Sequence, residues 1–570
     1  MKLVRLTILE KFRGLDEIIT NHGKEKFSVI FREDTPCEEW QNFHPYCFAG
    51  LNGSGKSNVL EAIANIFYHL ECCTLASETS EFLENDFKRE VADPVAYELE
   101  YFIIPHEAEK RIENYHNVII RKEKNKAPQI KIKALDQLEK PEFIDITNSI
   151  RTYLPELVIG YSSGENEILS LPFIKSRLLQ LDEYIYHLRN REKLVLNYKL
   201  EEKPESSLVF MDYHLSQAIL LANFLLQRED TIEPIKEQLG IDKLDSFRLV
   251  INNHKLYYDD EDPELGYLLP LVKETLDKLR KCATVKFTQL SDDERGFEYE
   301  VLDFYFDENK KTKESILKSA FQKHFNSPLQ LFKAFQVLSL LNLRVVDKQL
   351  KKEVYNSDSL YAMYKIPSFK EQQHIFHFNL FRLTKKNSDD KMLLKAFSDG
   401  EHQFLHTMGI CLLLGDKSTL MLLDEPETHF NPEWRSEFIS LLKDCLNKSD
   451  TNHLMRDILI TSHSPFIISD CFPDKVIVFD KGKQPQNAQD LEIDTFGTSV
   501  NILTNKIFKR KNTIGNYSLK KLNAYRERFL ETGNVDELIE ELNSELGDSI
   551  EKVLLIKEMT DKIKKNDKTL

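Results

Sequence analysis

The sequence predicts an α/β fold: a parallel sheet forms its centre, with an antiparallel β lobe and a mostly helical insertion beside it. Residues 46–67 form the pattern strand, glycine-rich loop and helix, and residues 397–480 alternate between helices and apolar strands. Alternating segments between 93 and 135 predict the antiparallel lobe. The 570 residues exceed the roughly 150 of a usual domain, so we expect one large core with insertions.

Composition places the chain among ordinary globular proteins, with 41% hydrophobic and 30% charged residues. The eight cysteines are scattered, without CxxC pairs or Cys/His spacing for zinc, so free thiols are expected. The start of the chain is charged, and no apolar run reaches ~18 residues. We therefore expect a cytoplasmic protein with no membrane partner.

The net charge of −16 disfavours non-specific binding of nucleic acid, because phosphate contacts need clustered cations. One basic cluster stands out and is either a local contact patch or an ordinary solvated surface: Lys506, Lys509, Arg510 and Lys511.

Four segments divide the chain. Residues 1–165 hold the first half of the core, and 391–482 hold the second half. Residues 166–390 form the insertion, a lid or dimerisation region with some strands; no heptad array indicates a long coiled coil. Residues 483–570 are helical and serve packing or partner docking. Their amphipathic stripe favours core packing over docking: Ile550, Val553, Leu554, Ile556, Met559 and Ile563.

Residues Gly50 to Ser57 match the pattern GxxxxGK[ST], between a predicted strand and a predicted helix. In such a loop the backbone N–H groups surround a phosphate, Lys56 reaches the β and γ oxygens, and Ser57 ligates Mg²⁺. ATP and Mg²⁺ are the expected cofactors. The residues expected to hold the nucleotide here are Asn52, Gly53, Ser54, Gly55, Lys56, Ser57 and Asn58.

Two carboxylates follow an apolar strand at Thr419 to Asp424. Burying an unpaired acid is costly, and a bound cation removes that cost. We therefore expect Asp424 to hold Mg²⁺ and Glu425 to act as the general base that takes a proton from the attacking water. The alternative, an exposed acidic turn, fits poorly with the apolar residues before it.

Two further segments complete the candidate site. Phe397 to Glu401 precedes a helix that we expect to open at His402, so Ser398, Gly400 and Glu401 would form a second phosphate site at a helix N-terminus. An apolar strand at 458–461 leads to His463, which we expect to reach the γ-phosphate from the sheet edge.

These four segments, in this order, resemble the ABC ATPases, whose LSGGQ signature corresponds to Phe397–Glu401 and whose switch histidine corresponds to His463. Asp399 stands where that signature has a glycine. The segment Pro426–Pro432 is similar to the EPExHxHP pattern of RecF, SMC-like and OLD-like ATPases. No clear Q-loop glutamine is found, and Tyr161–Glu167 occupies its place.

The resemblance implies a homodimer or higher homo-oligomer in which two ATP molecules lie between two heads. Lys56 and Ser57 of one subunit would then face Ser398 and Gly400 of the other, so hydrolysis would require the dimer.

The stretch Thr152–Phe173 resembles ATPases found beside restriction systems. Two short segments, Thr495–Gly497 and Ile514–Tyr517, resemble a C-terminal feature of the PtuA-type ATPases of Septu and retron-linked anti-phage systems. This resemblance implies control of a separate HNH nuclease similar to PtuB. In retron-linked systems it also implies a reverse transcriptase with its RNA–DNA hybrid.

Three other functions compete with this hypothesis. An OLD-like ATPase would carry its own nuclease, for which Asp490, Glu492 and Asp494 on an edge strand are candidate acids. An SMC-like or RecF-like repair ATPase would close a clamp on DNA, but the acidic charge and the missing coiled coil disfavour it. A transporter subunit is disfavoured by the long insertion.

Overall fold

The computed structural model describes most of the chain. The described part of the chain leaves out residues 21–22, 34–35, 76–86, 136–141, 145–147, 164–168, 190–206, 212, 258–264, 291–297, 307–314, 358–373, 387–390, 415–416, 449–452, 511, 533–534 and 567–570.

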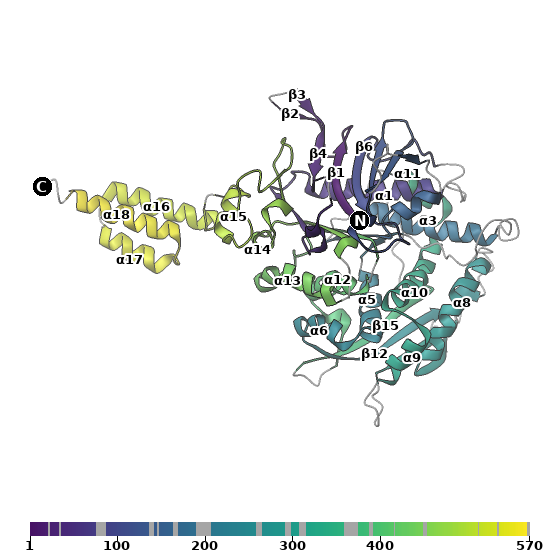
Figure 1. The fold of residues 1–570 in the computed structure, drawn as a ribbon. Helices are drawn as coiled ribbons and strands as arrows, with labels where there is room; N and C mark the ends of the chain where they lie inside the picture. The colour runs from purple at the N-terminus through teal and green to yellow at the C-terminus, as the bar shows by residue number, and fades with distance from the viewer. Residues whose placement is uncertain are drawn as a thin grey trace.

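A seven-stranded sheet forms the centre of the head (Figure 1). Every pair of neighbours is parallel except the last, which is antiparallel. The predicted parallel sheet is therefore confirmed. Its strands, in spatial order, are β11 (Leu208–Phe210), β10 (Leu157–Ser162), β17 (Thr419–Asp424), β18 (Arg456–Thr461), β5 (Tyr46–Gly50), β19 (Val476–Phe479) and β20 (Gln486–Asn487).

The antiparallel lobe covers one face of this sheet, with helix α1 (Lys56–Leu75) buried between the two sheets. Phe48 and Leu422 of the central sheet, Ile63 of α1 and Tyr101 of the lobe belong to one apolar core. The lobe's strands, in spatial order, are β4 (Phe27–Ile30), β1 (Lys2–Ile8), β6 (Tyr97–Ile103), β7 (His116–Lys122), β8 (Gln129–Ala134) and β9 (Glu142–Ile144). A separate hairpin pairs β2 (Ile18–Thr20) with β3 (Gly23–Glu25).

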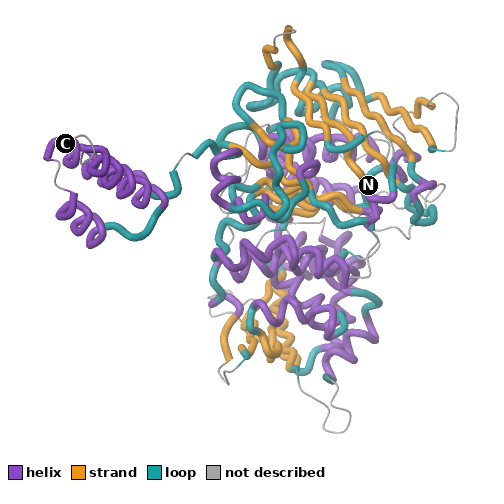
Figure 2. The backbone as a smooth tube through the Cα atoms, turned by 60° about the vertical axis from the view of Figure 1, so that its left-hand side comes forward, coloured by secondary structure: helices purple, strands orange, loops and turns teal. Residues whose placement is uncertain are grey.

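The insertion lies against the opposite face, where Figure 2 shows a layer of helices between the central strands and a smaller group of strands. These strands form an antiparallel sheet in the order β13 (Val285–Leu290), β14 (Glu298–Tyr305), β12 (Ile241–Asn252), β15 (Phe376–Lys385) and β16 (Lys391–Leu393). The insertion's helices are α3 (Ser170–Arg189), α5 (Tyr213–Leu226), α6 (Glu229–Gln238), α7 (Asn253–Tyr257), α8 (Leu265–Cys282), α9 (Ile316–His324), α10 (Pro328–Leu340) and α11 (Lys348–Asn356). Of these, α3 and α11 also contribute side chains to the core around α1.

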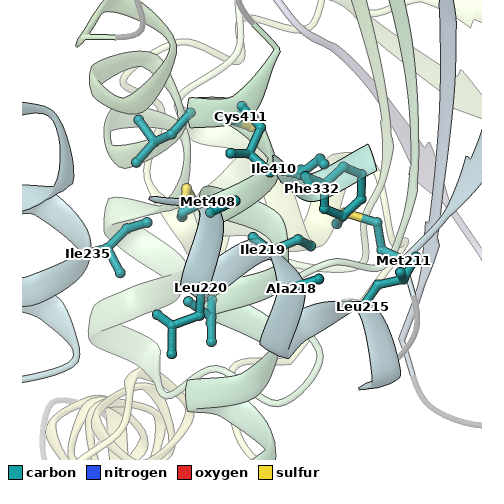
Figure 3. Close-up of a cluster of buried hydrophobic side chains, with 14 of the residues drawn as sticks. Met211, Leu215, Ala218, Ile219, Leu220, Ile235, Phe332, Met408, Ile410 and Cys411 are labelled. Carbon is teal, nitrogen blue, oxygen red and sulfur yellow. The ribbon is translucent and has the colours of Figure 1, made fainter. Parts of the chain in front are cut away.

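The predicted boundaries at 166 and 390 do not match the sheets. Strand β11, inside the predicted insertion, pairs in parallel with β10 and belongs to the central sheet. Strand β16, beyond the insertion's predicted end, pairs with β15. The apolar core is also continuous across the boundary, because α5 packs on helix α12 (Asp399–Leu413). Figure 3 shows this contact, with Ala218 and Ile219 of α5 lying near Met408 and Ile410 of α12.

The remaining elements extend toward the C-terminus. They are α13 (Pro432–Lys448), α14 (Pro465–Ser469), α15 (Val500–Lys506), α16 (Asn516–Thr532), α17 (Val535–Glu545) and α18 (Ile550–Asn566). Helices α16–α18 form a bundle that projects from the head (Figures 1 and 2) and has its own small core.

The predicted stripe on α18 is only partly the packed face. Leu555 and Met559 are buried in the bundle and Ile556 is half-buried. Ile550, Val553 and Leu554 are exposed, which corrects that part of the prediction. The side chain of Ile563 lies outside the described ones.

Three further expectations are corrected or limited. The signature helix begins at Asp399, not at His402, because Ser398 caps it. Asp490, Glu492 and Asp494 lie in exposed turns and loop after β20, not on an edge strand. In the basic cluster, Lys509 is paired with Asp480 and Arg510 donates to the carbonyl of Ile514, while Lys511 lies outside the described residues.

The eight cysteines are free. In the part of the chain that the structure describes, no single helix is long and apolar enough to cross a membrane. One pair of helices with a bend between them, Pro328–Leu343 and Lys348–Asn356, has the length and composition of a membrane span when the two are taken together. Length and composition are its only resemblance to such a span.

Candidate nucleotide-binding site

Three neighbouring parallel strands end at the same edge of the central sheet. β5 ends at Gly50 and leads into the phosphate loop, β18 ends at Thr461, and β17 ends at Asp424. Because parallel strands present their carboxyl ends together, segments about 370 residues apart in sequence meet at this edge. Sequence spacing alone could not reveal the order β17-β18-β5.

Glycines give the phosphate loop its shape. Gly53 and Gly55 have φ values of 69° and 101°, a backbone region that side chains with a Cβ rarely adopt. At Gly50 a Cβ would lie 2.1 Å from the carbonyl oxygen of Phe479. Ser54 closes the loop by donating to the carbonyl of Leu51 at 2.7 Å. Helix α1 starts directly after the loop, at Lys56, so its N-terminus faces the loop.

Lys56 is buried inside its own loop. Its Nζ donates to the carbonyls of Gly50 at 3.2 Å and Leu51 at 3.1 Å. Burial lowers the pKa of Lys56, and the nearby carboxylates Glu425 and Asp424 oppose that shift. The loop therefore holds a cation where a phosphate anion would neutralise it.

The expected Mg²⁺ ligands lie side by side. The Ser57 hydroxyl donates to Asp424 Oδ1 at 2.8 Å, and the Thr461 hydroxyl donates to the same oxygen at 2.6 Å. Asp424 is 3% exposed, and burial raises its pKa against the effect of these hydrogen bonds. A buried carboxylate beside a hydroxyl suits a hard divalent cation, so these residues fit Mg²⁺.

Glu425 and His463 meet beside this pair, with His463 Nε2 at 3.4 Å from Glu425 Oε1. Burial, then the charge of Lys56, lowers the pKa of His463 to about 4. The imidazole is therefore neutral at pH 7 and lies beside the carboxylate without a charge of its own. Glu425 has a φ of 48°, an unusual conformation for a residue other than glycine.

The signature residues are organised separately. The Ser398 side chain accepts from the backbone N–H of Glu401, and the Glu401 carboxylate accepts from the backbone N–H of Ser398 at 2.8 Å. This capping box fixes the first turn of α12. Lys385 pairs with Glu401 and lies over the ring of Phe397. Gly400 packs against the carbonyl of His429. A Cβ added at position 400 would lie 2.8 Å from that carbonyl oxygen.

Two predicted residues have surroundings that differ from the expectation. Asn58 was expected to hold nucleotide, but its side chain accepts from the backbone N–H of Gly14 at 3.3 Å and lies beside Glu61. It therefore ties α1 to the antiparallel lobe. In the proposed Q-loop region, Tyr161 is buried and its hydroxyl bonds to Gln403, while residues 164–168 lie outside the described part of the chain.

Sequence reasoning missed four residues that support the site: Thr461, Gln403, Glu427 and Ser462. Thr461 binds Asp424, and Ser462 donates to the buried carboxylate of Glu427. Burial raises the pKa of Glu427 to about 7, against the hydrogen bond from Ser462. Thr461 could have been found from the sequence, because its hydroxyl stands at the end of an apolar strand, as Asp424 does. No periodicity marks Gln403.

The central parallel sheet, with a glycine-rich loop and a buried carboxylate at one edge, is suited to binding a nucleotide phosphate and a divalent cation. Residues 216–469, less than half of the chain, match the family model described as "AAA domain, putative AbiEii toxin, Type IV TA system". The matched range includes the signature, Asp424, Glu425 and His463 and begins after the phosphate loop.

Two individual proteins show similarity. Protein ea59 of Escherichia phage lambda is 28% identical over 141 residues, which are 23% of this chain and 26% of ea59. The match thus spans about a quarter of that relative. A solved structure of the recombination mediator protein RecF-ATPrS in the RecFOR pathway is 12% identical, covering 85% of this chain and 97% of its own, with a TM-score of 0.30.

Proposed function

We propose that the chain is a Mg²⁺-dependent ATPase that works as a head-to-tail dimer and controls a separate nuclease in anti-phage defence. The observation that carries the ATPase proposal is the convergence of Ser57, Asp424 and Thr461 at one sheet edge beside Lys56 and Glu425. Bound Mg²⁺ would neutralise phosphate charge at Ser57 and Asp424. Lys56 and the loop N–H groups orient the β and γ phosphates.

Glu425 is the proposed general base. Its carboxylate is partly exposed and lies 3.4 Å from a neutral His463, so it can accept a proton from a water molecule in line with the γ-phosphate. The single N–H of the neutral His463 can donate either to this carboxylate or to the γ-phosphoryl group that is transferred to water. Thr461 holds Asp424 and the backbone of Glu425 together, because its hydroxyl also accepts from the Glu425 N–H at 3.0 Å.

The head-to-tail dimer is supported by the exposure of Ser398 and Asp399 at the start of α12. These residues form the N-terminus of helix α12. It would supply N–H groups to the ATP held by Lys56 of a second copy.

Mixing two inactive variants tests this arrangement. Lys56→Ala should lose ATP binding, and Ser398→Glu should repel the γ-phosphate of the opposite site. In a mixed dimer one site would combine the intact Lys56 of one copy with the intact Ser398 of the other. We expect the mixture to regain ATPase activity above that of either variant alone and up to about a quarter of wild type, since half of the dimers are mixed and each has one intact site. Two inactive variants that stay inactive when mixed would contradict the dimer.

The nuclease partner is supported by the resemblance to PtuA-type ATPases and by the description of the matching family, which names a toxin of a toxin–antitoxin system. An HNH nuclease similar to PtuB is the proposed partner, joined in retron-linked systems by a reverse transcriptase and its RNA–DNA hybrid. Purification with MgATP from cells that carry the native neighbouring genes, followed by mass spectrometry, tests this. Recovery of the ATPase alone, with ATP-dependent DNA binding, would favour a RecF-like repair clamp.

A further inference from the structure

Gln403 connects the signature helix to the catalytic turn of the same chain. It lies on α12, five residues after the cap Ser398, and is 2% exposed. Its Oε1 accepts from the backbone N–H of His429 at 3.0 Å, and its Nε2 donates to the carbonyl of Glu425 at 3.4 Å. One buried amide therefore holds both ends of the turn 425–429.

The turn needs such support because Glu425 is held in the left-handed backbone region, with a φ of 48°. Its N–H donates to Thr461 of β18, and its carbonyl accepts from Gln403 and from Thr428 Oγ1 at 3.0 Å. The direction of the Glu425 carboxylate thus depends on the position of α12.

The first turn of α12 also presses directly on the other end of this segment. The backbone at Gly400 lies so close to the carbonyl of His429 that a Cβ at position 400 would not fit. A shift of the helix N-terminus must therefore move the catalytic turn, either by direct contact at His429 or through the amide of Gln403.

We propose that Gln403 is a positioning residue that transmits the engagement of Ser398 with one ATP to Glu425, which acts on the other ATP. The inference rests on the proposed head-to-tail dimer, in which Ser398 and Glu425 of one chain face different nucleotides. ATP bound at the signature end fixes α12, and α12 fixes the general base through the amide. The two sites then hydrolyse ATP cooperatively.

A purely structural role would give a different result. A buried amide that fills space and satisfies two backbone groups contributes to stability, and its loss would lower the unfolding midpoint without a specific effect on turnover. The two roles separate in the steady-state kinetics, because only the positioning role acts on kcat and on the ATP dependence of the rate.

The test uses Gln403→Met in the full-length protein, since methionine keeps the volume and removes both hydrogen bonds. The matched control is Asn223→Leu. Asn223 is another buried amide that reaches α12, donating to the carbonyl of Gly409 at 2.9 Å, far along the helix from the catalytic turn. ATPase rate against ATP concentration, binding of a fluorescent ATP analogue and the unfolding midpoint are measured for wild type and both variants.

We expect wild type and Asn223→Leu to show a Hill coefficient above one. Gln403→Met should bind the ATP analogue with affinity within about twofold of wild type, lose about tenfold in kcat and lose the cooperativity. Equal kcat and Hill coefficient in Gln403→Met and Asn223→Leu would overturn the inference while leaving the ATPase proposal intact. A wild-type Hill coefficient of one would also overturn it. Absence of ATP hydrolysis in wild type and in Asn223→Leu would instead remove the proposed function, and the inference with it.

Discussion

The two halves of the proposed nucleotide site are built differently in the same chain. Side-chain and backbone hydrogen bonds join Ser57, Asp424, Thr461 and Glu425, which lie on segments far apart in sequence. His463 lies 3.4 Å from Glu425. The signature half instead bonds mainly to its own neighbourhood, because Ser398 and Glu401 cap their helix reciprocally and Lys385 pairs with Glu401.

The difference shows which parts a single chain arranges by itself. The groups proposed for metal binding and proton transfer are already held in place by tertiary contacts. The signature end is a stable helix start that faces solvent, and we propose that a second copy completes its role. Four substitutions sharpen this comparison.

The largest effect is expected for Glu425→Gln. Glutamine keeps the shape but cannot take a proton, so kcat should fall by about 10²–10⁴-fold while ATP binding is retained. Phosphate release measures kcat, and ATP-dependent dimerisation, followed by size-exclusion chromatography, reports ATP binding. Glu433→Gln, at an exposed acid nearby on α13, is the control and should behave as wild type. Normal turnover in Glu425→Gln would remove the residue from the role of base.

Glu427→Gln should change stability in a pH-dependent way. Because the pKa of Glu427 is raised from 4.5 to about 7, folding favours its protonated form, and the stability that this provides is lost as pH rises through about 7. A neutral glutamine, which still accepts from Ser462, should stabilise the protein by up to roughly 3 kcal/mol at pH 8 and by little at pH 5. Urea unfolding at both pH values measures this, and a gain that is equal at both would contradict the buried, protonated carboxyl.

Thr461→Val should reduce kcat by about tenfold. Valine keeps the shape but removes both the donor to Asp424 and the acceptor for the Glu425 N–H. Thr419→Val is the matched control, because Thr419 is a buried threonine at the opposite end of β17. If both variants lose activity equally, the effect comes from the sheet and not from the site.

The smallest effect on folding is expected for Ser398→Ala. Loss of a helix N-cap should cost about 1 kcal/mol of stability. Ser315→Ala removes a comparable cap from α9 in the insertion and should cost a similar amount. Only Ser398→Ala should also lower ATPase activity. Equal activity in the two variants would show that Ser398 serves the helix alone.

Much of the fold could be predicted from local patterns. In the lobe, apolar and polar residues alternate along the strands with a period of two residues. The strands that end at Asp424 and Thr461 instead contain unbroken apolar runs. The start of α12 was misplaced although the Ser-x-x-Glu spacing of Ser398 and Glu401 is a capping-box pattern. Strand β11 was missed because three residues give too little periodicity.

The phosphate loop, the acidic strand end and the signature helix could be predicted from the residues alone, because each is a local pattern of residue types whose chemistry depends on near neighbours. Only the tertiary structure decided that β18 lies between β17 and β5, which brings Thr461 onto Asp424. It also decided that Gln403 reaches the turn 425–429 and that the insertion shares its core with the head. These contacts join segments far apart in the chain, and packing, not local propensity, selects them.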